Sequence, residues 1–137
     1  MKIDRNYLSA AAFLFEQARG IEIGNHEKEV INSEGLKPSQ VLSIANDIKE
    51  FVESNLVAGN DLLGAAIWAL GKRADNSDVS FLENVLAKVI ESDSGAAYQT
   101  MIALENAGIN IFGGSSNLQD VEHNKEIGRN YLARNNA

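Results

Sequence analysis

The sequence predicts an all-helical protein, and three observations lead to this expectation. Apolar residues recur at spacings of three and four along most of the chain, as they do on the buried face of a helix. Proline occurs once in 137 residues, so little in the sequence interrupts a helix. No stretch shows the apolar–polar alternation typical of a half-buried strand. An apolar fraction of 45% is sufficient for a hydrophobic core, and we expect residues 1–137 to form a single domain.

The first half of the chain predicts two long helices with an irregular segment between them. Asp4 is the expected N-cap of the first helix, and Gly20 is expected to end it. Residues 20–38 are the least regular part of the sequence, and Pro38 suits the first turn of the second long helix. The predicted helices cover residues 5–19, 26–34 and 39–55.

The second half of the chain predicts four further helices, over residues 61–73, 78–91, 94–106 and 117–133. The signal is clearest in residues 78–91, where apolar pairs such as Val85 and Leu86 recur every four residues. Ser116 and Gln119 match a capping box at the start of the last helix. That helix has a sparse apolar stripe, which is typical of the end of a stacked array. We expect residues 134–137 to be a frayed tail.

An internal repeat is the most specific feature of the sequence. Residues 66–72, AIWALGK, align with residues 100–106, TMIALEN, at an offset of 34, and residues 11–15 give a weaker echo. Small residues precede both segments and allow neighbouring helices to approach closely. In this respect the chain resembles the HEAT and armadillo class of helical repeats.

The resemblance implies a short right-handed α-solenoid of about three HEAT-like helix pairs. Residues 1–56 would form a divergent first pair that contains the irregular segment 20–38, and residues 60–133 would form two further pairs. A generic helical bundle is the alternative, because it produces the same apolar stripes. We favour the solenoid because a recurrence at 34 residues is the better repeat signal.

The charge of the chain is −7, and its middle part is strongly acidic. Residues 41–93 carry nine acidic residues against four basic ones. This balance repels phosphate backbones and anionic lipids, so it argues against nucleic-acid and membrane binding and favours a basic protein partner. The alternative is that the acidic residues only aid solubility.

The sequence also predicts where the protein resides. It has no cysteine, which excludes disulfides and thiolate metal sites. No signal-peptide pattern and no apolar run of about 20 residues is apparent, so we expect a cytoplasmic, unprocessed protein.

Known catalytic motifs are absent from the sequence. The two histidines, His26 and His123, do not form an HExxH pattern, and residues 113–116, GGSS, lack the lysine of a phosphate-binding loop. No carboxylate lies within an apolar run that would raise its pKa for acid–base chemistry. We therefore expect no catalytic residues, no cofactor and no metal site.

Two features favour binding. Trp68 is either an exposed aromatic anchor or, as we favour, a residue packed on the neighbouring helix pair. The polar faces of the second helices of each pair would line the concave side of a HEAT-like stack and form one acidic surface; the alternative is a solvated face without a partner. The residues predicted to bind a partner are Asp47, Glu50, Glu53, Ser80, Glu83, Asn84, Glu91, Asn124 and Glu126.

The chain is similar in type to bacterial immunity proteins, which are small, acidic cytoplasmic partners of basic toxin nucleases. The similarity lies in size, charge, lack of cysteine and helical build. It implies a protein that binds and neutralises a basic toxin domain. A HEAT-like scaffold or adaptor in a larger complex is the first alternative, and a small ligand-binding helical domain or enzyme is the second.

Overall fold

The computed structural model of the chain describes residues 3–56, 60–112 and 120–135. These residues form seven α-helices and two short 3₁₀ turns, and they contain no strand. The prediction of an all-helical protein is thereby confirmed. The helices are α1 (Arg5–Ala18), α2 (Asn25–Ser33), α3 (Val41–Ser54), α4 (Leu63–Gly71), α5 (Val79–Val89), α6 (Ser94–Asn106) and α7 (Val121–Asn135), and the 3₁₀ turns are η1 (Pro38–Gln40) and η2 (Asn76–Asp78).

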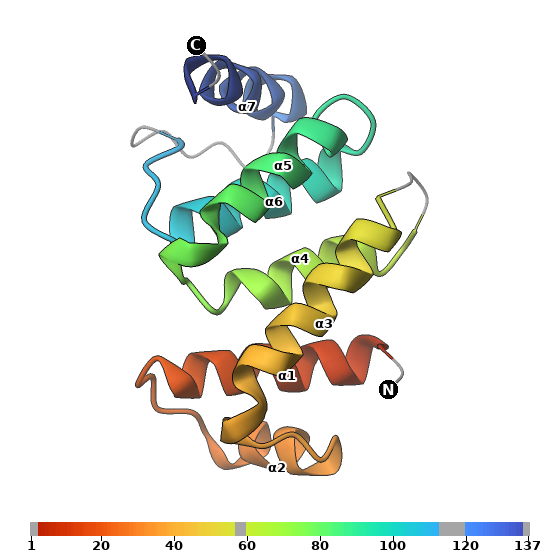
Figure 1. Cartoon of the computed structure of the whole chain (residues 1–137), viewed down its shortest axis with the longest axis vertical. Coiled ribbons are helices and arrows are strands. Elements are labelled where there is room, and N and C mark those ends of the chain that lie inside the picture. Colours follow the sequence, from red (N-terminus) through yellow and green to blue (C-terminus); the bar gives the residue numbers. More distant parts are fainter. Residues whose placement is uncertain (1–2, 57–59, 113–119, 136–137) are drawn as a thin grey trace.

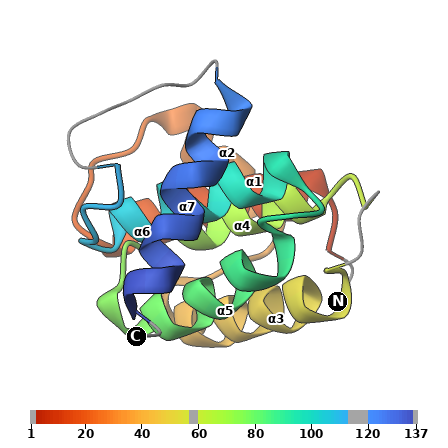
Figure 2. The same ribbon diagram turned by 90° about the horizontal axis from the view of Figure 1, so that it is seen from above.

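The helices are stacked from α2 at one end of the molecule to α7 at the other (Figure 1). Helices α1, α4 and α6 follow one another through the stack, since α1 packs on α4 and α4 packs on α6. Helices α3 and α5 lie together on one side of this row (Figure 2), where α3 contacts α1 and α4, and α5 contacts α6. Helix α7 closes the stack by packing on α6 and α5.

One of the expected helix pairs is not among the main contacts of the structure. The two pairs expected over residues 60–133 correspond to α4 with α5 and to α6 with α7. Helix α7 packs on α6 as expected, whereas α4 packs mainly on α6, α1 and α3. The reason lies in α4, whose apolar residues cover nearly its whole circumference, so it is buried among α1, α3 and α6.

Both ends of α1 follow the predicted capping residues. The Asp4 side chain accepts a hydrogen bond from the backbone N–H of Tyr7, at 2.9 Å. Gly20 and Gly108 adopt φ values of +87° and +102°, which favour glycine after a helix. The start of α7 differs from the prediction. That helix begins at Val121, with Asp120 accepting from the His123 N–H, and the predicted capping box lies outside the described residues.

Two predicted helices begin with a tighter turn. Pro38 opens η1, and the α-helix itself starts only at Val41. In the same way η2 precedes α5, and the Asp75 side chain caps it by accepting from the Ser77 N–H at 2.9 Å. Pro38 and Asp78, which were expected in the first turns of α-helices, therefore lie in 3₁₀ turns.

Helices α4 and α6 approach each other closely at Gly71. A Cβ atom added to Gly71 would lie 2.9 Å from the Cβ of Ala103 and 3.1 Å from its Cα. Trp68, on the same helix, is half-buried against the core, and its ring lies 5.5 Å from the Nζ of Lys72. Trp68 therefore packs rather than projecting as a free anchor. None of the helices within the described ranges is long and apolar enough to cross a membrane.

Candidate binding surface

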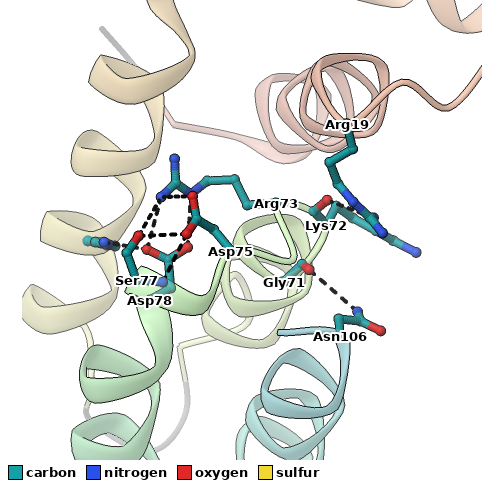
Figure 3. A network of polar contacts seen from close by, with 9 residues as sticks. Arg19, Gly71, Lys72, Arg73, Asp75, Ser77, Asp78 and Asn106 are labelled. Atoms are coloured by element: carbon teal, nitrogen blue, oxygen red, sulfur yellow. Dashed lines mark hydrogen bonds and ion pairs between the residues drawn. The ribbon is translucent and has the colours of Figure 1, made fainter. Parts of the chain in front are cut away.

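A buried ion cluster fixes α3 against the turn that connects α4 to α5 (Figure 3). The Asp78 side chain is only 2% exposed. The Nε of Arg73 lies 2.9 Å from one carboxylate oxygen of Asp78, and the Nζ of Lys49, on α3, lies 2.6 Å from the other. Buried charges of this kind require partners, because an unpaired one loses its hydration without compensation. The cluster therefore determines where α3 lies.

Arg73 completes this cluster by also binding Asp75, at 3.2 Å. Hydrogen bonds from the backbone and hydroxyl of Ser77 lower the pKa of Asp75, and the hydrogen bond to Asp78 raises the pKa of Arg73. Two cations thus face two carboxylates, and the group has no net charge. Its ion pairs join α3 to the turn between α4 and α5.

The outer face of α3 has a different character. Asp47, Glu50 and Glu53 are all exposed, and none of them forms an ion pair with another described residue. Lys49, the only base on this helix, is directed into the buried cluster. Three carboxylates on one helix therefore face solvent, and none of them forms an ion pair with another described residue. We call Asp47, Glu50 and Glu53 the α3 acidic face.

A hollow of about 320 Å³ lies on one side of the α3 acidic face. Asp47 and Glu50 stand beside the apolar side chains of Ile3 and Phe51 there. Such a hollow has room for an aliphatic or aromatic side chain of a partner, and the carboxylates are placed to bind a basic group next to it.

A second hollow of about 320 Å³ lies on the other side of this face, between α3 and α5. Its apolar part comes from Leu56, Phe81 and Val85, and Glu53 stands at its edge. Lys88 is the one basic residue among those that line it. The α3 acidic face is thus flanked by a hollow on each side.

The remaining predicted residues are arranged differently. Ser80 and Asn84 are exposed on α5, where Asn84 borders the second hollow, and Glu126 is exposed on α7. Glu83 accepts a hydrogen bond from the Tyr131 hydroxyl. The prediction that Asn124 faces solvent is wrong, because this residue is 7% exposed and lies against α6 and the end of α5.

Glu91 is exposed but its charge is compensated. Both of its carboxylate oxygens lie 2.6 Å from nitrogens of Arg129, and Lys125 lies at 3.4 Å. The hydrogen bond from Arg129 is the main reason that the pKa of Glu91 falls to about 2. These partners on α7 are 34 and 38 residues away in the chain, so no local pattern indicated them. Glu91 therefore fastens α7 to the end of α5.

Tyr7 lies beneath α3 with its phenol group buried. It is 2% exposed, and its hydroxyl has no hydrogen-bond partner among the described residues. Burial, and to a smaller extent the negative charge of Asp47, raise the pKa of Tyr7 from 10.0 to about 12. The phenol therefore stays neutral throughout the physiological range.

The pKa of Tyr7 leads to a prediction for alkaline solution. Because the folded-state pKa lies above the unfolded one, this group favours the folded state below pH 10, and the contribution disappears as the pH rises toward 12. Between pH 9 and pH 11 the wild type should lose about 1.4 kcal/mol of unfolding free energy more than Tyr7→Phe, measured by urea denaturation.

The control for this prediction is the other buried tyrosine. At neutral pH Tyr7→Phe should remain within about 0.5 kcal/mol of wild type, because no hydrogen bond within the described ranges is lost. Tyr131→Phe removes the bond to Glu83 and should cost about 1.5 kcal/mol. Equal pH dependence of wild type and Tyr7→Phe would show that the phenol is not desolvated.

Neither a metal centre nor a likeness to a known protein directs the functional assignment. In the part of the chain that the structure describes, no group of three or more histidine, cysteine or acidic residues is arranged to hold a metal ion. Comparison of the chain with protein-family models, curated proteins and solved structures found no match. The assignment therefore depends on the surface itself.

Proposed function

We propose that this chain is a protein-binding module that uses the α3 acidic face to bind a basic protein. The observation that carries the proposal is the combination of three exposed carboxylates, none of which forms an ion pair with another described residue, with a hollow on each side that contains apolar side chains. Interfaces commonly combine charge complementarity, which accelerates encounter, with a few apolar side chains seated in hollows, which slow dissociation. The overall charge of −7 adds a long-range attraction toward the same partner.

The form of this function that we favour is inhibition of a basic toxin domain, as by a bacterial immunity protein in the cytoplasm. A nuclease carries basic residues around its active site because it binds phosphates. An acidic helix face that resembles a phosphate backbone in charge competes for those residues. The similarity in type to immunity proteins supports this form, as does the helical stack, which we further propose to be a short right-handed solenoid of HEAT-like pairs.

Charge reversal on α3 tests the proposal. The double variant Asp47→Lys with Glu50→Lys should lower the association rate with the partner at least tenfold at low salt, because both the attraction and its steering are lost. The partner is first isolated from the source cells by cross-linking and affinity capture, and the rate is then measured by surface plasmon resonance at several salt concentrations. Glu83 is left unchanged because its carboxylate binds Tyr131.

The matched control is Glu22→Lys with Glu29→Lys. Both residues are exposed near α2, at the end of the stack, and the net charge changes by the same amount. This control should retain the partner and its salt dependence. If the association rate fell equally in both double variants, the effect would come from the overall charge of the protein. If it fell in neither, the α3 acidic face would not be part of the interface. A captured partner that is not basic would favour a scaffold over a toxin inhibitor.

A further inference from the structure

A cavity distinct from the α3 acidic face lies where α6 and α7 meet the end of α5. Its volume is about 200 Å³, and its walls are mainly apolar, from Ile90, Ala97, Tyr98, Met101 and Val121. A cavity of about 150 Å³ with apolar walls is known to accept benzene, so this space suits one aromatic ring or a branched alkyl group.

The cavity results from the way α7 approaches its neighbours. A Cβ atom on Gly128 would lie 2.7 Å from the Cδ1 of Ile90 and 3.3 Å from the Sδ of Met101, so the helices are in close contact at this point. One turn earlier, on the same face of α7, Asn124 takes the place of Gly128. The space between this turn of α7 and the first turn of α6 is left as the cavity.

Asn124 lines the cavity, and its side-chain oxygen is a buried hydrogen-bond acceptor without a donor among the described residues. It is 7% exposed, and its Oδ1 has no hydrogen-bond partner among the residues that the structure describes. Buried amide groups are nearly always hydrogen-bonded, because the loss of hydration is otherwise uncompensated. A half-turn of the amide exchanges its donor and acceptor, so the group can serve either kind of ligand. A bound ligand would supply the missing bond.

The charges around the cavity are already compensated. The carboxylate of Asp93 caps α6 by accepting from the Ala96 N–H at 3.0 Å, so the helix N-terminus carries its own anion. Lys125, at the cavity wall, lies 3.4 Å from Glu91. A charged ligand would lose hydration on entry, and Lys125, the charged residue that lines the cavity, already has an ion-pair partner in Glu91. These features favour an uncharged ligand.

We propose that this cavity binds an uncharged small molecule with one aromatic or branched alkyl group and one hydrogen-bonding group. The apolar group occupies the space between Ala97 and Met101, and the polar group bonds to the amide of Asn124. Benzamide has both parts and serves as the probe. Benzoate tests the effect of charge, toluene the effect of the ring alone, and acetamide the effect of the amide alone.

Titration of the full-length chain, followed by ¹H–¹⁵N correlation spectra, tests the proposal. Benzamide should cause saturable shifts of the backbone amides of residues 94–98 and 121–125, with an affinity about tenfold higher than that of toluene. Acetamide and benzoate should bind more weakly than benzamide. Absence of saturable shifts in these segments would overturn the proposal, and tighter binding of benzoate would overturn the assignment of an uncharged ligand.

Variants separate the two parts of the site. Asn124→Leu should weaken benzamide about tenfold and leave toluene unaffected, whereas Ala97→Leu fills the cavity and should remove both. Asn130→Leu, at an exposed position of the same helix, is the control and should bind as the wild type does. Unchanged benzamide affinity in both Asn124→Leu and Ala97→Leu would contradict the proposal. If Asn124→Leu does not fold, the benzamide titrations of the wild type and of Ala97→Leu test the proposal.

Discussion

Asp78→Ala is expected to lower the free energy of unfolding by about 3 kcal/mol. The substitution leaves Arg73 and Lys49 facing each other without the carboxylate that both of them bind. Their side chains are 11% and 23% exposed, so water compensates only part of the lost interaction. The partial exposure of Lys49 places the effect at the lower end of the range typical for a broken buried pair. Urea denaturation followed by circular dichroism measures it.

Asp75→Ala is the matched control for this prediction. Asp75 binds the same arginine, but its side chain is 45% exposed. An exposed ion pair contributes about 1 kcal/mol or less, and the loss of the η2 cap adds about as much. The control should therefore lose clearly less stability than Asp78→Ala. If both variants lost the same free energy of unfolding, the burial of Asp78 would not strengthen its contribution to stability.

Gly71→Ala should destabilise the protein by about 2 kcal/mol. The added Cβ would lie 3.1 Å from the Cα of Ala103, and this neighbour is backbone that cannot rotate away. Helices α4 and α6 would have to separate at the centre of the stack, and overpacking of this kind typically costs 1–3 kcal/mol. Thermal or urea unfolding of the single variant provides the measurement.

Gly64→Ala, in the same helix, should have the opposite effect. Its added Cβ would meet only the Cγ of Gln99, at 3.9 Å, which is an ordinary contact. Because alanine favours helix more than glycine does, a gain of up to about 1 kcal/mol is expected. If both alanine variants were stabilised, the helices would not be in close contact at Gly71.

The helices were predictable because their signals are local. The three–four spacing of apolar residues and the cap Asp4 act over short stretches of chain, so the helices were found within a few residues. The order of packing was not predictable in this way. Helix α4 is apolar nearly all round, so its wheel does not indicate which neighbours it contacts.

In the candidate sites, too, local features were predictable from the sequence and contacts between distant segments were not. Exposure of Asp47, Glu50 and Glu53 followed from their position opposite the apolar stripe of α3. Asn124 was misplaced because α7 has so few apolar residues that polar ones also occupy its buried face. The hollows and the cavity arise between segments distant in sequence, and the shape of the cavity depends on the close contact at Gly128.

The inward orientation of Lys49 has a consequence for recognition. Because this lysine and Asp78 hold α3 to the following turn, the α3 acidic face would already be in place when the proposed partner binds. Under the proposed protein-binding function, little conformational entropy would have to be lost on association, and the complex would form by near rigid-body docking. Differences in affinity among partners of similar charge should then reside in how well each fills the two hollows, and hence in how slowly it leaves.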